Sequence, residues 1–214
     1  MPKFPEPPGV DALRNIAPEI RTLAAGTPLA RIYYTAGAYP TAWNEFRFLG
    51  PLDARWDHHE QAGGEPPTLS TSCAILYAAL HVETCVAEVF QATRRIDRAR
   101  NAPWLTVFAS VQPLQLLDLS GAFPTRAGAS MAINSASHAR ARRWARAFYL
   151  AYEDLHGIYY CSSMHANAPA IALNERSVKL GTMPKYPLFN RPLIDDGMSH
   201  VLKHCARRLR YALI

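Results

Sequence analysis

Apolar and polar residues recur along the chain with two different periods, which predict short strands mixed with helices. Several runs rich in apolar and aromatic residues have the length typical of strands and are bounded by turn-forming residues. These runs are residues 30–34, 74–78, 104–110, 114–119, 158–160 and 170–174. Their irregular alternation with helical segments favours an α+β fold over a regular series of strand–helix–strand units.

Three segments show the helical period. Their apolar stripes are Val82/Val86/Val89/Phe90, Ala141/Trp144/Ala145/Phe148/Tyr152/Leu155 and Met198/Val201/Leu202/Cys205/Leu209. Each stripe covers one helix face, which we expect to be buried. We expect Asn134 or Ser135 to cap the second helix and Gly157 to end it in a left-handed conformation. The third helix, over about 195–213, has a basic opposite face.

The remaining segments are less regular. Residues 1–28 are rich in Pro and Ala and are predicted to form an extension with a short helix over 11–25. Residues 35–70 contain many turn formers, as in "GAYP", "LGPLD" and "QAGGEPP". Long irregular segments inside a compact domain are usually functional or mobile.

Composition narrows the class of protein. The 214 residues are enough for one buried core, and 49% hydrophobic with 19% charged residues argues against wholesale disorder. No apolar run approaches the roughly 18 residues that span a bilayer. The start "MPKFPEPPGVDALRN" lacks the apolar segment of a signal peptide, so we expect a cytoplasmic protein. The four cysteines form no CxxC, which favours reduced, buried thiols.

The formal charge of +6 is concentrated in three clusters. They are Arg94/Arg95/Arg98/Arg100, Arg140/Arg142/Arg143/Arg146 and Lys203/Arg207/Arg208/Arg210. Such clusters bind nucleic acid, an acidic partner or phosphate groups, or are solvated helix faces. We favour solvated faces over direct nucleic-acid binding, because no zinc-finger or RNA-binding signature accompanies the charge.

Common catalytic motifs are absent. The chain has no GxG pair of a dinucleotide-binding turn, no GxxxxGK[ST], no HExxH and no GxSxG. The histidines of "DHHEQ" are adjacent, and neighbouring side chains on a strand point to opposite faces. We therefore expect no metal site there.

Four stretches in order give a more specific indication. "LARIYY", "FRFLGPLDARWDHH", "ILYAALHVETCVAEVF" and "GIYYCSS…NAPAIALNERS" resemble, in type, order and spacing, the RES domain, the toxin of bacterial RES–Xre toxin–antitoxin modules. The resemblance covers residues 29–178, which leaves 1–28 as an N-terminal extension and 179–214 as a C-terminal extension. We expect the basic amphipathic helix of this second extension to pack on the domain.

The resemblance implies a fold and an activity. The fold is that of the ADP-ribosyltransferase toxins, a single domain with a split β core and flanking helices. The activity is degradation of NAD, the substrate, by hydrolysis or phosphorolysis of the nicotinamide–ribose bond, without a metal. The implied partner is an antitoxin with an Xre-type helix-turn-helix domain.

Five residues fall on family motifs. The family's first-strand arginine falls on Arg31, its loop arginine on Arg55, its strand tyrosine on Tyr77, its helix glutamate on Glu88 and its serine on Ser162. Cys161 stands where the serine motif usually has proline, which removes a rigid turn element in front of the serine.

The chemistry of NAD cleavage suits these residue types. Nicotinamide leaves as a neutral pyridine while the ribose gains positive charge, so one carboxylate, Glu88, can stabilise the sugar. Arginines such as Arg31 and Arg55 hold phosphate oxygens with paired hydrogen bonds. Tyr77 offers a face for stacking on nicotinamide, and Ser162 a hydroxyl for the ribose or the carboxamide.

Two other functions stay open from the sequence. The same site can transfer ADP-ribose to a protein. Alternatively, the basic helices serve a nucleic-acid or partner-binding module, whose binding would be salt-sensitive and independent of Glu88. The basic surface can equally dock an acidic antitoxin or a second copy of the chain.

Overall fold

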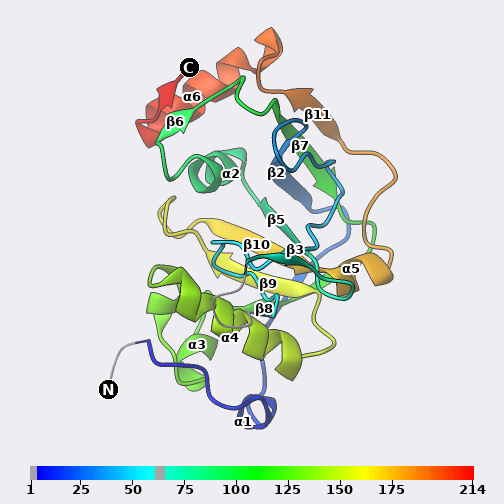
Figure 1. The fold of residues 1–214 in the computed structure, drawn as a ribbon, viewed down its shortest axis with the longest axis vertical. Helices are drawn as coiled ribbons and strands as arrows, with labels where there is room; N and C mark the ends of the chain where they lie inside the picture. Colours follow the sequence, from blue (N-terminus) through cyan, green and yellow to red (C-terminus); the bar gives the residue numbers. More distant parts are fainter. Residues whose placement is uncertain (1–3, 61–65) are drawn as a thin grey trace.

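An eight-stranded mixed sheet forms the frame of the computed structural model, which describes residues 4–60 and 66–214 (Figure 1). In spatial order the strands are β1 (Ile20–Leu23), β8 (Leu114–Asp118), β9 (Gly157–Cys161), β10 (Pro169–Asn174), β5 (Ile75–Ala79), β2 (Pro28–Tyr34), β7 (Pro103–Ala109) and β11 (Phe189–Pro192). Neighbouring strands are antiparallel except for β8 and β9. This architecture confirms the predicted α+β fold.

The sheet is nearly divided between β5 and β2. Whereas β2 pairs with β7 from Pro28 to Tyr34, its pairing with β5 is confined to Ala30 and Ala79. Beyond that pair the two strands separate. The upper half in Figure 1 therefore holds β2, β7 and β11, and the lower half holds β10, β9 and β8. This division is the split β core that the family resemblance implied.

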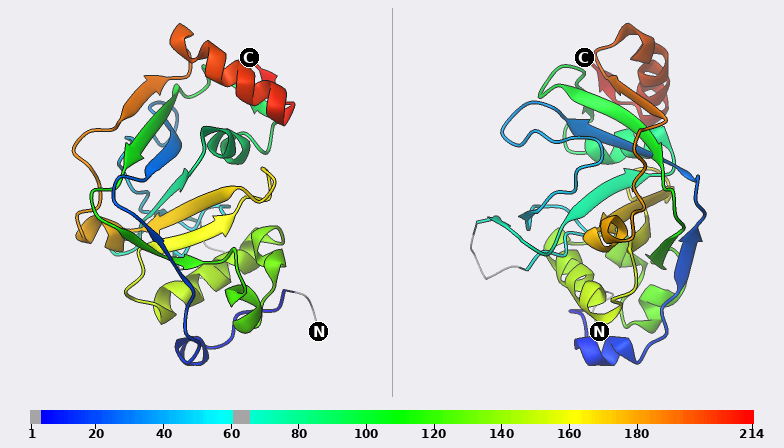
Figure 2. Two further views of the ribbon diagram at one scale, coloured as in Figure 1. Left: turned by 180° about the vertical axis from the view of Figure 1, so that it is seen from behind. Right: turned by 90° about the vertical axis from the view of Figure 1, so that its right-hand side faces the viewer.

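Helices pack on the sheet, and the buried apolar residues form two separate cores. The helices are α1 (Val10–Arg14), α2 (Val82–Val89), α3 (Phe123–Arg126), α4 (His138–Ala151), α5 (Glu175–Lys179) and α6 (Ser199–Leu209), with 3-10 turns at Met131–Asn134 and Asp196–Met198. On β8, Leu116 faces the smaller core and Leu117 the larger one, as expected for alternating side chains. Helices α4 and α6 lie at opposite ends of the molecule (Figure 2).

Four short strands pair outside the main sheet. They are β3 (Leu49–Gly50) with β4 (Thr68–Leu69), and β6 (Arg95–Ile96) with β12 (Ala212–Leu213). The second pair places the end of the chain beside α6, which packs on α2. None of the helices in the described ranges is long and apolar enough to cross a membrane.

The N-terminal prediction is wrong in part. The helix expected over 11–25 ends at Arg14, and Ile20–Leu23 forms the edge strand β1. Three of its four residues are exposed, so the segment lacks the alternation that marks a strand. Its identity as a strand comes from pairing with β8.

Both predicted ends of the second long helix are also wrong. Helix α4 begins at His138, whereas Asn134 ends the preceding 3-10 turn and its buried side chain donates to the carbonyl of Leu119 at 3.4 Å. The helix ends at Ala151, and Gly157 is the first residue of β9. A Cβ at Gly157 would lie 2.1 Å from the carbonyl oxygen of Ala172, so glycine is needed there for close strand packing.

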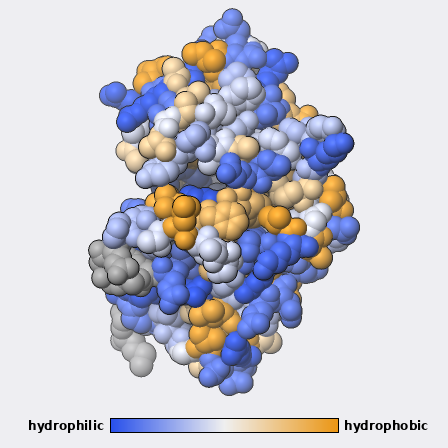
Figure 3. Space-filling model, turned by 45° about the vertical axis from the view of Figure 1, so that its right-hand side comes forward, coloured by the Kyte–Doolittle hydropathy of each residue, from blue (hydrophilic) through white to orange (hydrophobic). Residues whose placement is uncertain are grey.

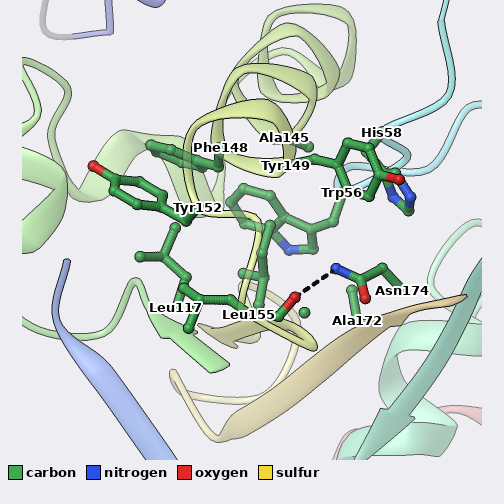
Figure 4. Close-up of a pocket in the computed structure, with 12 residues that line it drawn as sticks. Trp56, His58, Leu117, Ala145, Phe148, Tyr149, Tyr152, Leu155, Ala172 and Asn174 are labelled. Carbon is green, nitrogen blue, oxygen red and sulfur yellow. Dashed lines mark hydrogen bonds between the residues drawn. The ribbon is translucent and has the colours of Figure 1, made fainter. Parts of the chain in front are cut away.

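A small cavity lies between α4 and the lower half of the sheet (Figure 4). Its volume is about 30 Å³, and it is lined largely by apolar and aromatic side chains, among them Trp56, Phe148 and Leu155. Asn174 donates to the carbonyl of Leu155 at its edge, at 3.0 Å. A cavity of this size holds one or two water molecules and no larger ligand.

Candidate active site

A cavity of about 900 Å³ opens where β5 and β2 separate. Ligand pockets typically measure about 300–1,000 Å³, so this cavity has room for a large metabolite. Its walls come from β2, β5, α2 and the long irregular segment that precedes β5. Figure 3 shows a hollow across the middle of one face with apolar side chains on its rim. Four of the predicted residues line the cavity: Arg31, Arg55, Tyr77 and Glu88.

Glu88 contributes a partly buried carboxylate to the cavity wall. It lies in the last turn of α2, one residue before the end of the helix. Burial raises the pKa of Glu88, while the hydrogen bond from Ser162 and the positive charges of Arg55 and His138 oppose the rise. All three neighbours favour the ionised carboxylate over the protonated acid.

Ser162 lies behind Glu88 rather than on the cavity surface. The residue is fully buried, directly after β9, and its hydroxyl donates to the Oε1 atom of Glu88. The backbone N–H groups of Met164 and His165 donate to the same hydroxyl at 3.2 and 3.1 Å. These two donors leave the hydroxyl proton for Glu88. The structure thus places Ser162 where it orients the carboxylate.

Cys161 stands where the family motif usually has proline, and backbone hydrogen bonds fix the chain there instead. It pairs with Pro169 across β9 and β10, and the N–H of Ser162 donates to the carbonyl of Ala168 at 2.9 Å. Backbone pairing on both strands therefore fixes the position of Ser162.

Arg55 lies on the cavity wall and acts electrostatically on Glu88. Its Nη1 atom donates to the carbonyls of Ala136 at 2.5 Å and Ile133 at 3.4 Å. Burial lowers the pKa of Arg55, and the negative charge of Glu88 counteracts this effect. Arg55 therefore contacts the segment before α4 through its hydrogen bonds and acts on Glu88 through its charge.

Arg31 is buried on β2 and holds part of the long irregular segment. Its Nη1 atom donates to the carbonyls of Trp43 and Glu45 at 3.0 and 2.9 Å. Burial lowers its pKa to about 10, which still leaves it charged at neutral pH. The structure shows that Arg31 holds the irregular segment by these two hydrogen bonds. Binding of phosphate by Arg31 stays a prediction.

Tyr77 and Tyr160 form an aromatic wall with Trp56. The Tyr77 hydroxyl accepts the backbone N–H of Trp56 at 3.2 Å, and the rings of Trp56 and Tyr160 have centroids 5.3 Å apart. Burial raises the pKa of both tyrosines, so both hydroxyls are neutral donors. Sequence reasoning did not single out Tyr160, although it lies two residues before Ser162 in the quoted motif.

Two further polar residues of the cavity were missed. Asp53 and His138 both line it, and the Oδ1 atom of Asp53 lies 3.1 Å from Nδ1 of His138. One comes from a loop and the other from the first turn of α4. No local motif joins them, because 85 residues separate them in the chain.

The "DHH" residues are held by buried polar contacts. Asp57 contacts Arg47 at 2.7 Å and His59 at 2.6 Å, and these partners outweigh burial and hold its pKa well below the usual range. His58 lies 3.5 Å from Glu175 and stacks on Tyr149. In the described part of the chain no group of three or more His, Cys, Asp or Glu residues is arranged to hold a metal ion.

A family model for the RES domain matches residues 28–189, about three quarters of the chain. The chain belongs to the RES domain family. All five residues that sequence reasoning selected lie within the match. No curated protein matches this RES domain.

A solved structure supports the fold. This RES domain is similar to a chain in the crystal structure of the M. tuberculosis MbcT–MbcA toxin–antitoxin complex, with a TM-score of 0.51 and 14% sequence identity. The similarity covers 79% of the RES domain chain and 85% of the other chain.

Proposed function

We propose that this RES domain is the toxin of a bacterial toxin–antitoxin pair and that it degrades NAD by cleaving the nicotinamide–ribose bond. Family membership and the similarity to a chain of a toxin–antitoxin complex support the toxin role. The observation that carries the reaction is the carboxylate of Glu88, partly buried on the cavity wall and held by Ser162.

The chemistry follows from the position of this carboxylate. As the bond between ribose C1′ and nicotinamide lengthens, positive charge develops on the sugar while the leaving group becomes neutral. A fixed negative charge in a partly desolvated cavity stabilises this state more than it stabilises NAD, and so lowers the barrier. Since the leaving group needs no proton, one oriented carboxylate accounts for this part of the reaction.

The cationic and aromatic residues fit the rest of NAD. Arg31 and Arg55 line the same cavity as Glu88 and are candidates for holding the pyrophosphate. Tyr77 and Tyr160 offer apolar ring surface and neutral hydroxyls to nicotinamide and its ribose. The cavity of about 900 Å³ has room for the whole dinucleotide.

The basic cluster of α4 is used inside the chain. Arg140 and Arg143 bind Glu6 at 3.1 and 2.6 Å, and Arg142 binds Asp53 at 3.0 Å. These pairs account for the cluster as a set of internal contacts, which favours the enzyme over the nucleic-acid module. The proposed antitoxin partner has a helix-turn-helix domain of the Xre type.

A single substitution tests the proposal. Purified protein should release nicotinamide from NAD, and Glu88→Gln should lower kcat about 10³-fold, because the amide has the same shape without the charge. Glu83→Gln is the matched control, since Glu83 lies on the same helix but pairs with His204 and Arg208 outside the cavity. Full activity in Glu88→Gln would contradict the role of Glu88.

A second measurement separates degradation from protein modification. With labelled NAD and a bacterial lysate, degradation leaves free ADP-ribose or its phosphate. A discrete labelled protein band that depends on Glu88 would instead identify an ADP-ribosyltransferase.

A further inference from the structure

An aspartate–histidine pair lies in the cavity wall, and the reaction described above assigns it no proton transfer. Asp53 and His138 are joined by a 3.1 Å contact between Oδ1 and Nδ1. Arg142 binds the same Oδ1 atom at 3.0 Å. Both members of the pair line the cavity that contains Glu88.

The contact between Asp53 and His138 determines which nitrogen of the His138 ring is free to accept a proton. Burial raises the pKa of Asp53, but the hydrogen bonds from Arg142 and His138 outweigh it and hold the pKa below its usual range. An ionised Asp53 takes the N–H at Nδ1 of His138, so in the neutral ring Nε2 carries the lone pair. This arrangement is the one that orients an imidazole as a base.

His138 also lies close enough to Glu88 to act on it electrostatically. His138 and Glu88 thus lie near each other in the wall of the same cavity. The side chain of His138 is 33% exposed, so the ring is accessible to water. The charged groups that face the ring or its partner are Asp53 from the irregular segment, Arg142 from α4 and Glu88 from α2.

Glu88 is poorly suited to take the proton itself. Its Oε1 atom already accepts the hydroxyl of Ser162. A carboxylate that accepted a proton would also lose the negative charge that stabilises the sugar. The reaction therefore needs a second group, near Glu88 but not identical with it, to activate the nucleophile.

We propose, on the basis of the NAD cleavage proposed above, that His138 is the general base for an attacking water and that Asp53 positions it. The water oxygen forms a bond to ribose C1′, and the C1′–nitrogen bond breaks with its electron pair going to nicotinamide. One water proton passes to Nε2 of His138 and from there to solvent. The products are nicotinamide and ADP-ribose, so this assignment selects hydrolysis over phosphorolysis.

The test is the pH profile of nicotinamide release by His138→Gln, which keeps a donor for Asp53 but cannot act as a base. We expect kcat to fall about 10²-fold. A general base acts only when it is unprotonated, so the acid limb of log kcat/KM should be less steep in the variant than in the wild type. His200→Gln, on the exposed surface of α6, is the matched control and should behave like the wild type.

Two further measurements test the roles assigned to Asp53 and to water. Asp53→Asn, at an exposed side chain that leaves the core intact, should lower kcat about tenfold and leave KM for NAD nearly unchanged. ADP-ribose should form without inorganic phosphate and carry one oxygen from labelled water.

An unchanged pH slope in His138→Gln, or nicotinamide release that requires phosphate, would overturn the role of His138 while leaving NAD cleavage intact. A wild-type protein that releases no nicotinamide would overturn the proposed function itself.

Discussion

The carboxylate of Glu88 is held by a buried hydroxyl, and this hydrogen bond is the largest of the effects that lower its pKa. Ser162 receives two backbone N–H bonds and directs its own proton to the carboxylate, so its orientation is fixed from three sides. The neighbouring Ser163 is exposed. Two adjacent serines therefore have different environments, which the sequence motif alone does not distinguish.

Replacing Ser162 by alanine should raise the pKa of Glu88, because the hydrogen bond from Ser162 lowers it. The carboxylate would then ionise only at higher pH, and the acid limb of kcat/KM should move to higher pH. A hydrogen bond to a charged group contributes about 1.5–3 kcal/mol, so we expect at least a tenfold loss of activity on the acid limb. The pH profile of nicotinamide release measures both effects.

Ser163→Ala is the control for that profile and should leave it unchanged. An acid limb of Ser162→Ala that stays in place, or moves to lower pH, would show that the hydroxyl does not set the charge state of Glu88.

The site residues that the sequence could reveal are those within family motifs. Glu88 was found because it lies off the apolar stripe of its helix and within a motif. Asp53 lies within a quoted stretch but matches no motif residue, His138 lies outside all four stretches, and only the packing of α4 against the loop brings them together. Their contact depends on tertiary structure, which neither periodicity nor spacing describes.

At the scale of the elements, prediction was best where a segment is buried. Strands β2, β5, β7 and β10 were expected within two residues of their observed bounds. The strands β1 and β11 were missed, because both are edge strands with mostly exposed or half-exposed residues. Strand β11 also contains Pro192, which is tolerated at a sheet edge but weakens any strand pattern.

Gly157 provides a test of how the lower half of the sheet is packed. Gly157→Ala should destabilise the fold by about 1–3 kcal/mol, because the new methyl group would meet the carbonyl of Ala172 and push β9 away from β10. Urea unfolding followed by circular dichroism measures the change in the free energy of unfolding.

Gly9→Ala is the matched control, since a Cβ at Gly9 meets no atom within 4 Å, and its effect should stay within about 0.5 kcal/mol. Equal stability of the two variants would mean that β9 and β10 can separate without loss.

At the scale of the whole molecule, the site lies where the sheet is weakest. The halves are joined between β5 and β2 by pairing at Ala30 and Ala79, and the cavity opens beyond that pair. Arg31 belongs to one half, whereas Tyr77 and Tyr160 belong to the other. A ligand that fills the cavity would therefore connect the two halves as well as bind to each.

NAD bound to the inactive Glu88→Gln protein should stabilise the whole domain. At a concentration 100 times its Kd, a ligand that binds the folded state adds about 2.7 kcal/mol, which for a chain of this length raises Tm by about 5–10 °C. Hydrogen exchange should slow in β2 and in β5 together, because the ligand restrains both sides of the split.

Arg55→Met in the same background should reduce the rise in Tm, since it removes a cationic contact from the cavity wall. Protection confined to one half of the sheet would show that NAD does not bridge the split, and that the two halves bind and open independently.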